Sequence, residues 1–86
     1  KVFNECLIYV RKSCPFCIDA ISDLNSRGIK SRIIEIDLCP ESFIQQLKAA
    51  YEHSSFPMIL EYNKGYETYA WIGGYNDLKE ALENDQ

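Results

Sequence analysis

The sequence predicts an α/β fold with the element order βαβαββα. An apolar run over residues 6–10 is followed by a helical apolar pattern and then by an isoleucine-rich run over residues 32–37. Two strands joined through a helix in this way pair in parallel through a right-handed crossover. Farther along, the turn sequence Asn63-Lys64-Gly65 separates two strand-like runs, which predicts an antiparallel hairpin.

The βαβ unit is predicted from residues 4 to 37. Residues 4–10 form an apolar run suited to a central strand. The first helix covers residues 15–27, because Pro15 suits the first helical position and Gly28 suits the residue after the last turn. The alternating residues 32–37 form the second strand. The expected buried face of the helix consists of Ile18, Ile21 and Leu24.

The second half of the chain adds a helix, the hairpin and a last helix. Cys39-Pro40-Glu41 again places proline near a helix start, and the helical pattern continues to about residue 52. The hairpin strands are predicted over residues 57–62 and 66–72. Asp77, with Glu80 three residues on, forms a capping-box pattern at the start of the last helix. The residues expected to be buried there are Leu78, Ala81 and Leu82.

Composition and charge limit the function classes. The chain has 86 residues, of which 47% are hydrophobic, so we expect residues 1–86 to form a single domain. No apolar run approaches the roughly 20 residues that span a bilayer, and the start of the chain lacks a signal-peptide pattern. Residues 1–40 carry six basic and five acidic residues, whereas residues 41–86 carry three and eight. An acidic chain without a basic cluster argues against nucleic-acid binding.

Four cysteines occur in the chain, and two of them form the motif Cys14-Pro15-Phe16-Cys17. The thiols of such a pair come within disulfide reach when the first cysteine caps a helix and the second lies in its first turn. Cys6 falls in a predicted buried strand and Cys39 at a helix start, where each is expected to act as a small apolar residue. We therefore expect a reducing, cytoplasmic compartment rather than a secreted disulfide scaffold. A four-thiolate zinc site built from all four cysteines is the alternative.

The position of the motif predicts its chemistry. Thiol–disulfide exchange requires a thiolate, and the free N–H groups at a helix N-terminus favour an ionised sulfur. Arg11 and Lys12 add positive charge just before the motif. Such surroundings lower a cysteine pKa from about 8.5 to roughly 3.5–7.5. We therefore predict that Cys14 is the nucleophile and that Cys17, lying deeper, is the resolving thiol.

Three motifs together resemble the dithiol glutaredoxins of the thioredoxin fold. They are Cys14-Pro15-Phe16-Cys17 (usually Cys-Pro-Tyr-Cys), Ser55-Phe56-Pro57 (usually Thr-Val-Pro) and the stretch Gly73-Gly74-Tyr75-Asn76-Asp77. The resemblance covers essentially the whole chain. It implies a four-stranded mixed sheet of order 2-1-3-4 flanked by three helices. The thioredoxins themselves fit less well, because the Trp-Cys-Gly-Pro-Cys motif and the extra N-terminal strand and helix are absent.

The resemblance also implies a glutathione groove beside the cysteines. A cation three positions before the first cysteine, here Arg11, helps bind glutathione in the family. Pro57 is expected to be cis, and the backbone of Phe56 to pair with the glutathione cysteine like an added strand. The start of the last helix is expected to receive the γ-glutamyl carboxylate. The implied groove comprises Arg11, Phe16, Ser55, Phe56, Pro57, Gly74, Tyr75, Asn76 and Asp77, and the implied catalytic motif comprises Cys14, Pro15, Phe16 and Cys17.

The function implied is glutathione-dependent reduction of protein–glutathione mixed disulfides and of protein disulfides. The alternative is a carrier dedicated to one partner, for example ribonucleotide reductase, with little general glutathione activity. Glutathione is the expected co-substrate, disulfide-containing proteins are the expected partners, and a monomer is the family expectation. No metal is expected. Relatives that bridge an iron–sulfur cluster mostly carry glycine or serine near the nucleophile, where this chain has Pro15.

The chain departs from the family pattern in three places. Phe56 replaces a smaller β-branched residue, and Asn76 stands where many members carry Asp or Ser. The hairpin is longer than usual, and the resemblance does not explain its aromatic residues, among them Tyr69 and Trp71. Outside the motifs, the lone His53 is interpreted as ordinary surface. The lysines Lys48, Lys64 and Lys79 are interpreted as solvated charges.

Overall fold

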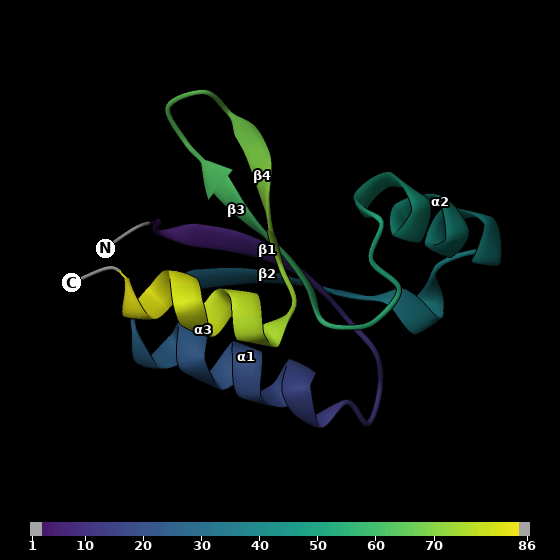
Figure 1. Cartoon of the computed structure of the whole chain (residues 1–86), viewed down its shortest axis with the longest axis horizontal. Helices are drawn as coiled ribbons and strands as arrows, with labels where there is room; N and C mark the ends of the chain where they lie inside the picture. The colour runs from purple at the N-terminus through teal and green to yellow at the C-terminus, as the bar shows by residue number, and fades with distance from the viewer. Residues whose placement is uncertain (1–2, 85–86) are drawn as a thin grey trace.

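The predicted element order is confirmed in the computed structural model, which describes residues 3–84 (Figure 1). The predicted domain range 1–86 includes residues 1–2 and 85–86, which lie outside the described residues. A short 3-10 helix, Ile36–Leu38, follows the second strand. The strands and helices are β1 (Glu5–Val10), α1 (Pro15–Ser26), β2 (Lys30–Glu35), α2 (Glu41–Tyr51), β3 (Met58–Asn63), β4 (Thr68–Gly73) and α3 (Tyr75–Glu83).

The four strands form one mixed sheet of order β2-β1-β3-β4. β1 pairs in parallel with β2 and antiparallel with β3, and β3 pairs antiparallel with β4. Ile8 lies at the centre, paired with Ile33 on one side and Ile59 on the other. This is the strand order that the family resemblance implied.

The sheet separates two hydrophobic clusters. α1 and α3 lie side by side on one face (Figure 1), where Leu24 and Leu78 pack with Ile8 and Ile59. On the other side, Ile44 and Leu47 of α2 pack with Ile36 and Met58. Phe56 contacts both clusters at the point where the chain enters β3. The end of the sheet that carries Val10 and Met58 is therefore held from both faces.

The predicted bounds of the second strand are wrong by two residues. β2 pairs with β1 from Glu5–Lys30 to Val10–Glu35, and it ends where β1 ends. Ile36 then leaves the sheet and is buried in the second cluster. The predicted start of the second helix is also shifted, because Pro40 is extended (φ −62, ψ 147) and precedes α2 as its N-cap residue.

The helix α3 begins two residues before the predicted cap. Gly74 is the N-cap residue, and the Asp77 carboxylate reaches back to accept the Gly74 N–H over 2.9 Å. Asp77 thus occupies the third helical position rather than the cap, and it makes the half of a capping box that a glycine cap allows. Leu78 and Leu82 are buried as predicted, whereas Ala81 is only partly buried.

Two further predictions differ from the structure. Ile18 was expected on the buried face of α1 but is 64% exposed, because the face that packs on the sheet is formed by Cys17, Ala20 and Leu24. β4 begins at Thr68 rather than residue 66, since residues 64–67 form the turn.

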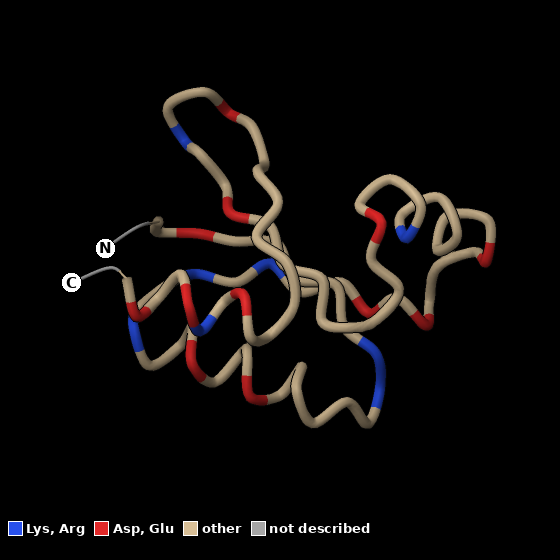
Figure 2. Tube along the Cα trace, in the orientation of Figure 1, with Lys and Arg blue, Asp and Glu red and all other residues tan. Residues whose placement is uncertain are grey.

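No helix among the described residues is long and apolar enough to cross a membrane. Acidic and basic residues are interspersed along the elements (Figure 2).

Candidate active site

The cysteine pair lies at the N-terminus of α1, as predicted. Cys14 is the N-cap residue, with extended backbone angles (φ −112, ψ 101), and Pro15 follows at the first helical position. The two cysteines form a disulfide with their Cα atoms 5.2 Å apart. The Cys17 N–H donates to Cys14 Sγ over 3.2 Å. The sulfur of Cys14 therefore occupies the place of an ordinary N-cap oxygen, facing the positive end of the helix dipole.

The backbone before the motif is unusual. Ser13 adopts a left-handed conformation with φ 54, which residues other than glycine rarely take. This residue turns the chain between the end of β1 and the helix start. Residues in such strained conformations persist only where the surrounding structure holds them, and they are frequent at functional sites.

The two cysteines differ in their exposure. Cys17 is 2% exposed and belongs to the core under α1, whereas Cys14 is half-buried at the edge of that core. The prediction that Cys17 lies deeper is confirmed. Phe16, between them, is 60% exposed. Only Cys14 is therefore placed for a first contact with a disulfide arriving from solvent.

The peptide bond between Phe56 and Pro57 is cis, as the resemblance implied. The Phe56 carbonyl oxygen lies 3.7 Å from Cys14 Sγ. Pro57 itself is buried, and β3 begins with the next residue, Met58. Ser55, just before this step, is exposed. The backbone at Phe56, in the bend before β3, thus lies directly beside the disulfide.

Arg11 lies near the cysteines but is not free. Its Nη1 donates to Asp37 Oδ1 over 2.7 Å, and its guanidinium carbon lies 4.8 Å from the centre of the Phe56 ring. The Lys12 backbone N–H donates to the other Asp37 oxygen over 2.8 Å. Asp37 was not predicted as a site residue, since it lies 26 positions from Arg11 and follows a strand whose bounds were predicted differently.

The ion pair gives stability a defined pH dependence. The Lys12 N–H, together with Arg11, lowers the pKa of Asp37 below its usual value of 3.8. A carboxyl with a lowered folded-state pKa stabilises the fold above its unfolded-state pKa, and this contribution is lost as pH falls through the folded-state value. We expect Asp37→Asn to reduce the free energy of unfolding more at pH 7 than at pH 3, measured by urea denaturation. An equal reduction at both pH values would contradict this role.

The start of α3 lies beside the cysteine motif, where Tyr75 contacts Phe16. Asn76 and Asp77 are exposed there, in the first turn, and the N–H groups of a first turn have no partner within their helix. The Tyr75 ring stacks on Phe16, with ring centres 5.9 Å apart. The Tyr75 hydroxyl donates to Asp23 Oδ2 over 2.9 Å, and this bond raises the pKa of Tyr75. Tyr75 therefore fixes α3 against α1 beside the cysteines.

His53 is not the ordinary surface residue that the sequence suggested. Its ring packs edge-on against Trp71, which stacks on Tyr51 with ring centres 4.5 Å apart. His53 Nε2 lies 3.3 Å from Ser55 Oγ. A Cβ atom at Gly74 would lie 3.4 Å from His53 Cε1. The hairpin residue Trp71 thus holds the loop that leads into the cis proline against the start of α3, which gives this aromatic residue a structural role.

The other two cysteines are free and do not join the pair. Cys6 is fully buried in β1, and burial raises its pKa to about 11. Cys39 is partly buried against the second hydrophobic cluster, which contains Ile44 and Leu47 of α2. Among residues 3–84, no three or more His, Cys, Asp or Glu side chains gather where they could hold a metal ion. The four-thiolate alternative is therefore not formed in this structure.

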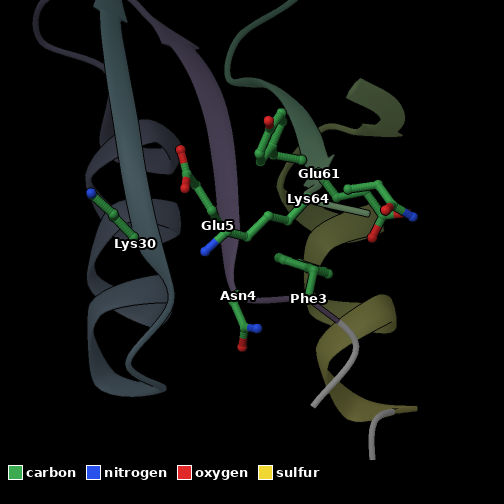
Figure 3. Close-up of a pocket in the computed structure, with 8 residues that line it drawn as sticks. Phe3, Asn4, Glu5, Lys30, Glu61 and Lys64 are labelled. Carbon is green, nitrogen blue, oxygen red and sulfur yellow. The ribbon is translucent and has the colours of Figure 1, made fainter. Parts of the chain in front are cut away.

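A separate cavity of about 450 Å³ lies at the opposite end of the sheet (Figure 3). No cysteine lines it. Two lysines and two glutamates give its walls mixed charge. Its lining residues are Phe3, Asn4, Glu5, Lys30, Glu61, Tyr62, Asn63 and Lys64. This cavity is therefore separate from the cysteine pair, which lies beyond the other end of β1.

Comparison with known proteins decides the family. The family model described as glutaredoxin matches residues 6–61, which contain the cysteine pair and the cis proline. The chain belongs to the glutaredoxin family. A glutaredoxin-like protein of Encephalitozoon cuniculi is 34% identical over 58 residues, which cover 65% of this chain and 41% of that protein. The glutaredoxins are thiol–disulfide oxidoreductases, and the Cys14–Cys17 disulfide fits the dithiol type.

Solved glutaredoxin structures share the fold of this glutaredoxin. The glutaredoxin of Brucella melitensis superposes with a TM-score of 0.72 at 22% identity, covering 99% of this chain and 85% of that one. The holo form of glutaredoxin C1 from Populus tremula x tremuloides gives 0.78 at 16% identity, with coverages of 93% and 75%. A dithiolic glutaredoxin of Trypanosoma brucei brucei gives 0.71 at 26% identity, with coverages of 95% and 79%.

Proposed function

We propose that this glutaredoxin uses glutathione to reduce protein–glutathione mixed disulfides and protein disulfides. One observation carries the proposal: Cys14 Sγ lies at a helix N-terminus and 3.7 Å from the carbonyl that precedes the cis proline. The reactive sulfur is thereby placed beside the backbone carbonyl of Phe56. A peptide disulfide can bind there by main-chain hydrogen bonds while its sulfur meets Cys14.

In the monothiol route only Cys14 reacts. Its thiolate attacks the glutathione sulfur of a mixed disulfide, the disulfide bond breaks, and the protein thiolate leaves. The new bond joins Cys14 to glutathione. A second glutathione thiolate attacks the glutathione sulfur of this adduct, which releases glutathione disulfide and restores the Cys14 thiolate. The Cys17 N–H stabilises that thiolate in both steps through the bond it donates to Cys14 Sγ.

In the dithiol route Cys17 completes the reaction. Cys14 first forms a mixed disulfide with the substrate protein. The Cys17 thiolate then attacks Cys14 Sγ, the substrate leaves as a thiolate, and the Cys14–Cys17 disulfide forms. The structure holds the pair in this oxidised form. Two glutathione molecules return it to the dithiol, which glutaredoxin potentials of about −200 to −230 mV permit.

The groove for glutathione is proposed to run from Phe56 to the start of α3. The Phe56 backbone pairs with the cysteine of glutathione, and the N–H groups in the first turn of α3 receive the γ-glutamyl carboxylate. Asn76 and Asp77 are exposed at this turn, and Ser55 lies exposed in the loop before Phe56. The proposed partners are glutathionylated and disulfide-containing proteins. The enzyme is proposed to be a monomer that meets them in the cytoplasm.

The test is the glutathione-dependent reduction of a small glutathione mixed disulfide by the wild-type protein. The proposal expects a rate well above the uncatalysed exchange and saturation with the mixed disulfide. A protein that reduces disulfides only when a particular partner protein is present would instead support the dedicated carrier, for example one serving ribonucleotide reductase. Absence of glutathione-dependent turnover would contradict the proposal.

A further inference from the structure

The two edges of the sheet differ in charge. β2 and β4 are the outer strands, and among residues 3–84 no further strand pairs with the outer side of either. β2 carries three exposed charged residues, Lys30, Arg32 and Glu35. Charged side chains on an edge strand hinder its pairing with another chain. β4, by contrast, has the sequence Thr-Tyr-Ala-Trp-Ile-Gly and carries no charged side chain. Only the β4 edge therefore lacks this protection.

The β4 edge is accessible and presents a different surface on each face of the sheet. Its first residues are exposed, and the outer part of the β3–β4 hairpin extends away from the helices (Figure 1). Because side chains alternate along a strand, Tyr69 and Trp71 share one face, whereas Ala70 and Ile72 share the other. The Tyr69 ring is 42% exposed and lies 5.0 Å from the ring of Tyr62. The face that carries the two tyrosines is thus aromatic and partly uncovered.

The other face of the β4 edge is acidic. A cavity of about 310 Å³ lies there between β4 and α3, and Ile72 forms part of its wall. Three carboxylates, those of Glu61, Asp77 and Glu80, line it, and none of its lining residues is basic. Asp77 accepts the Gly74 N–H, whereas neither Glu61 nor Glu80 forms an ion pair within residues 3–84. The negative charge beside the edge is therefore uncompensated by the described part of the chain.

We propose that the β4 edge binds an extended segment of a partner protein in which basic and apolar residues alternate. The main chain of the segment pairs with β4 as an added strand. Its apolar side chains lie beside Tyr69 and Trp71, and its basic side chains lie on the α3 side, where they meet Glu61 and Glu80. Acidic side chains in the same places would be repelled. Binding at this edge requires neither the cysteine pair nor glutathione, so it is an interaction beyond the proposed function.

The test uses Trp71, the single tryptophan of the chain, as a fluorescent reporter within β4. The probe is a short synthetic peptide of alternating lysine and valine, titrated without glutathione. We expect a saturable change in tryptophan fluorescence. A peptide with glutamate in place of lysine should bind at least about ten-fold more weakly. Equal affinity for the two peptides, or no saturable change with the lysine peptide, would overturn the proposal.

Variants and hydrogen exchange locate the contact. Ala70→Lys places a positive charge on the edge and should weaken binding of the lysine peptide at least about ten-fold, with the fold verified by circular dichroism. Glu80→Gln should weaken it about two- to five-fold. Glu35→Gln removes the same charge from the β2 edge and is the control, with unchanged affinity expected.

The bound peptide should slow hydrogen exchange of β4 backbone amides and leave those of β2 unchanged. Protection of β2 instead, or equal affinities of Glu80→Gln and Glu35→Gln, would contradict the assignment. Tryptophan fluorescence that changes with protein concentration alone would assign the edge to a second copy of the chain and also overturn the proposal. Because glutathione is absent throughout, any of these failures is distinct from a failure of the proposed function.

Discussion

Replacement of Cys14 by serine is expected to lower glutathione-dependent disulfide reduction by at least about 100-fold, because it removes the attacking sulfur. A serine hydroxyl at this position can still accept the Cys17 N–H, so α1 keeps its cap and the fold should be retained. The measurement is the rate with a small glutathione mixed disulfide, alongside circular dichroism to verify folding. Loss of activity without loss of structure assigns the nucleophile.

Cys17→Ser is the matched variant, since it removes the other sulfur of the same disulfide. We expect it to retain most of the activity on mixed disulfides with glutathione and to lose the reduction of protein disulfides. Cys17 lies on the buried face of α1, whereas Cys14 at the N-cap position is half-buried. The Cys17 sulfur is therefore poorly placed for the first attack. Equal losses in the two variants with the mixed disulfide would refute the separation of roles.

Gly73→Ala is expected to destabilise the fold by about 2 kcal/mol or more. Gly73 has φ 131, a conformation that L residues rarely adopt. A Cβ atom there would also collide with the Asp77 side chain, at 2.8 Å from Asp77 Cβ. That side chain caps α3 by accepting the Gly74 N–H, so moving it removes the cap as well. For a domain of this size the change corresponds to a fall in Tm of roughly 8–16 °C.

Gly28→Ala provides the control. Gly28 also has a positive φ of 70, but a Cβ atom there would meet no other atom within 4 Å. The Gly28→Ala variant introduces the backbone strain without the collision. It should lower the free energy of unfolding by about 1 kcal/mol. Thermal unfolding of both variants separates the two effects. If the two glycine variants lose equal stability, the contact with Asp77 is not what requires glycine at position 73.

The sequence alone determined the features whose causes are local. Proline after Cys14 and an apolar helical pattern behind it place the cysteine at a helix N-terminus, because the missing proline N–H and the cap geometry involve only neighbouring residues. The element order follows in the same way from short-range periodicity. The cis bond at Pro57 and the strand order 2-1-3-4 came from the three motifs taken together, and both are present.

The N-terminus of α3 shows where the local sequence pattern becomes ambiguous. Asp77 followed by Glu80 and Gly74 followed by Asp77 both fit a helix start, because an acidic residue stabilises the first turn at either position. The structure uses Gly74 and Asp77. Burial of Leu78 and Leu82 against the sheet is compatible with this start, and burial is a property of the whole fold.

Tertiary structure alone decided which charges and rings meet at the site. β2 ends where its partner β1 ends, and only that register brings Asp37 to Arg11. The packing of α2 then places Lys48 at the Phe56 ring, and Trp71 of the hairpin holds His53 near Gly74. The contacts of Arg11 with Asp37 and of His53 with Trp71 join residues 26 and 18 positions apart, so no local pattern specifies them. Sequence thus determined where the reactive sulfur is, and long-range packing determined which charges and aromatic rings surround it.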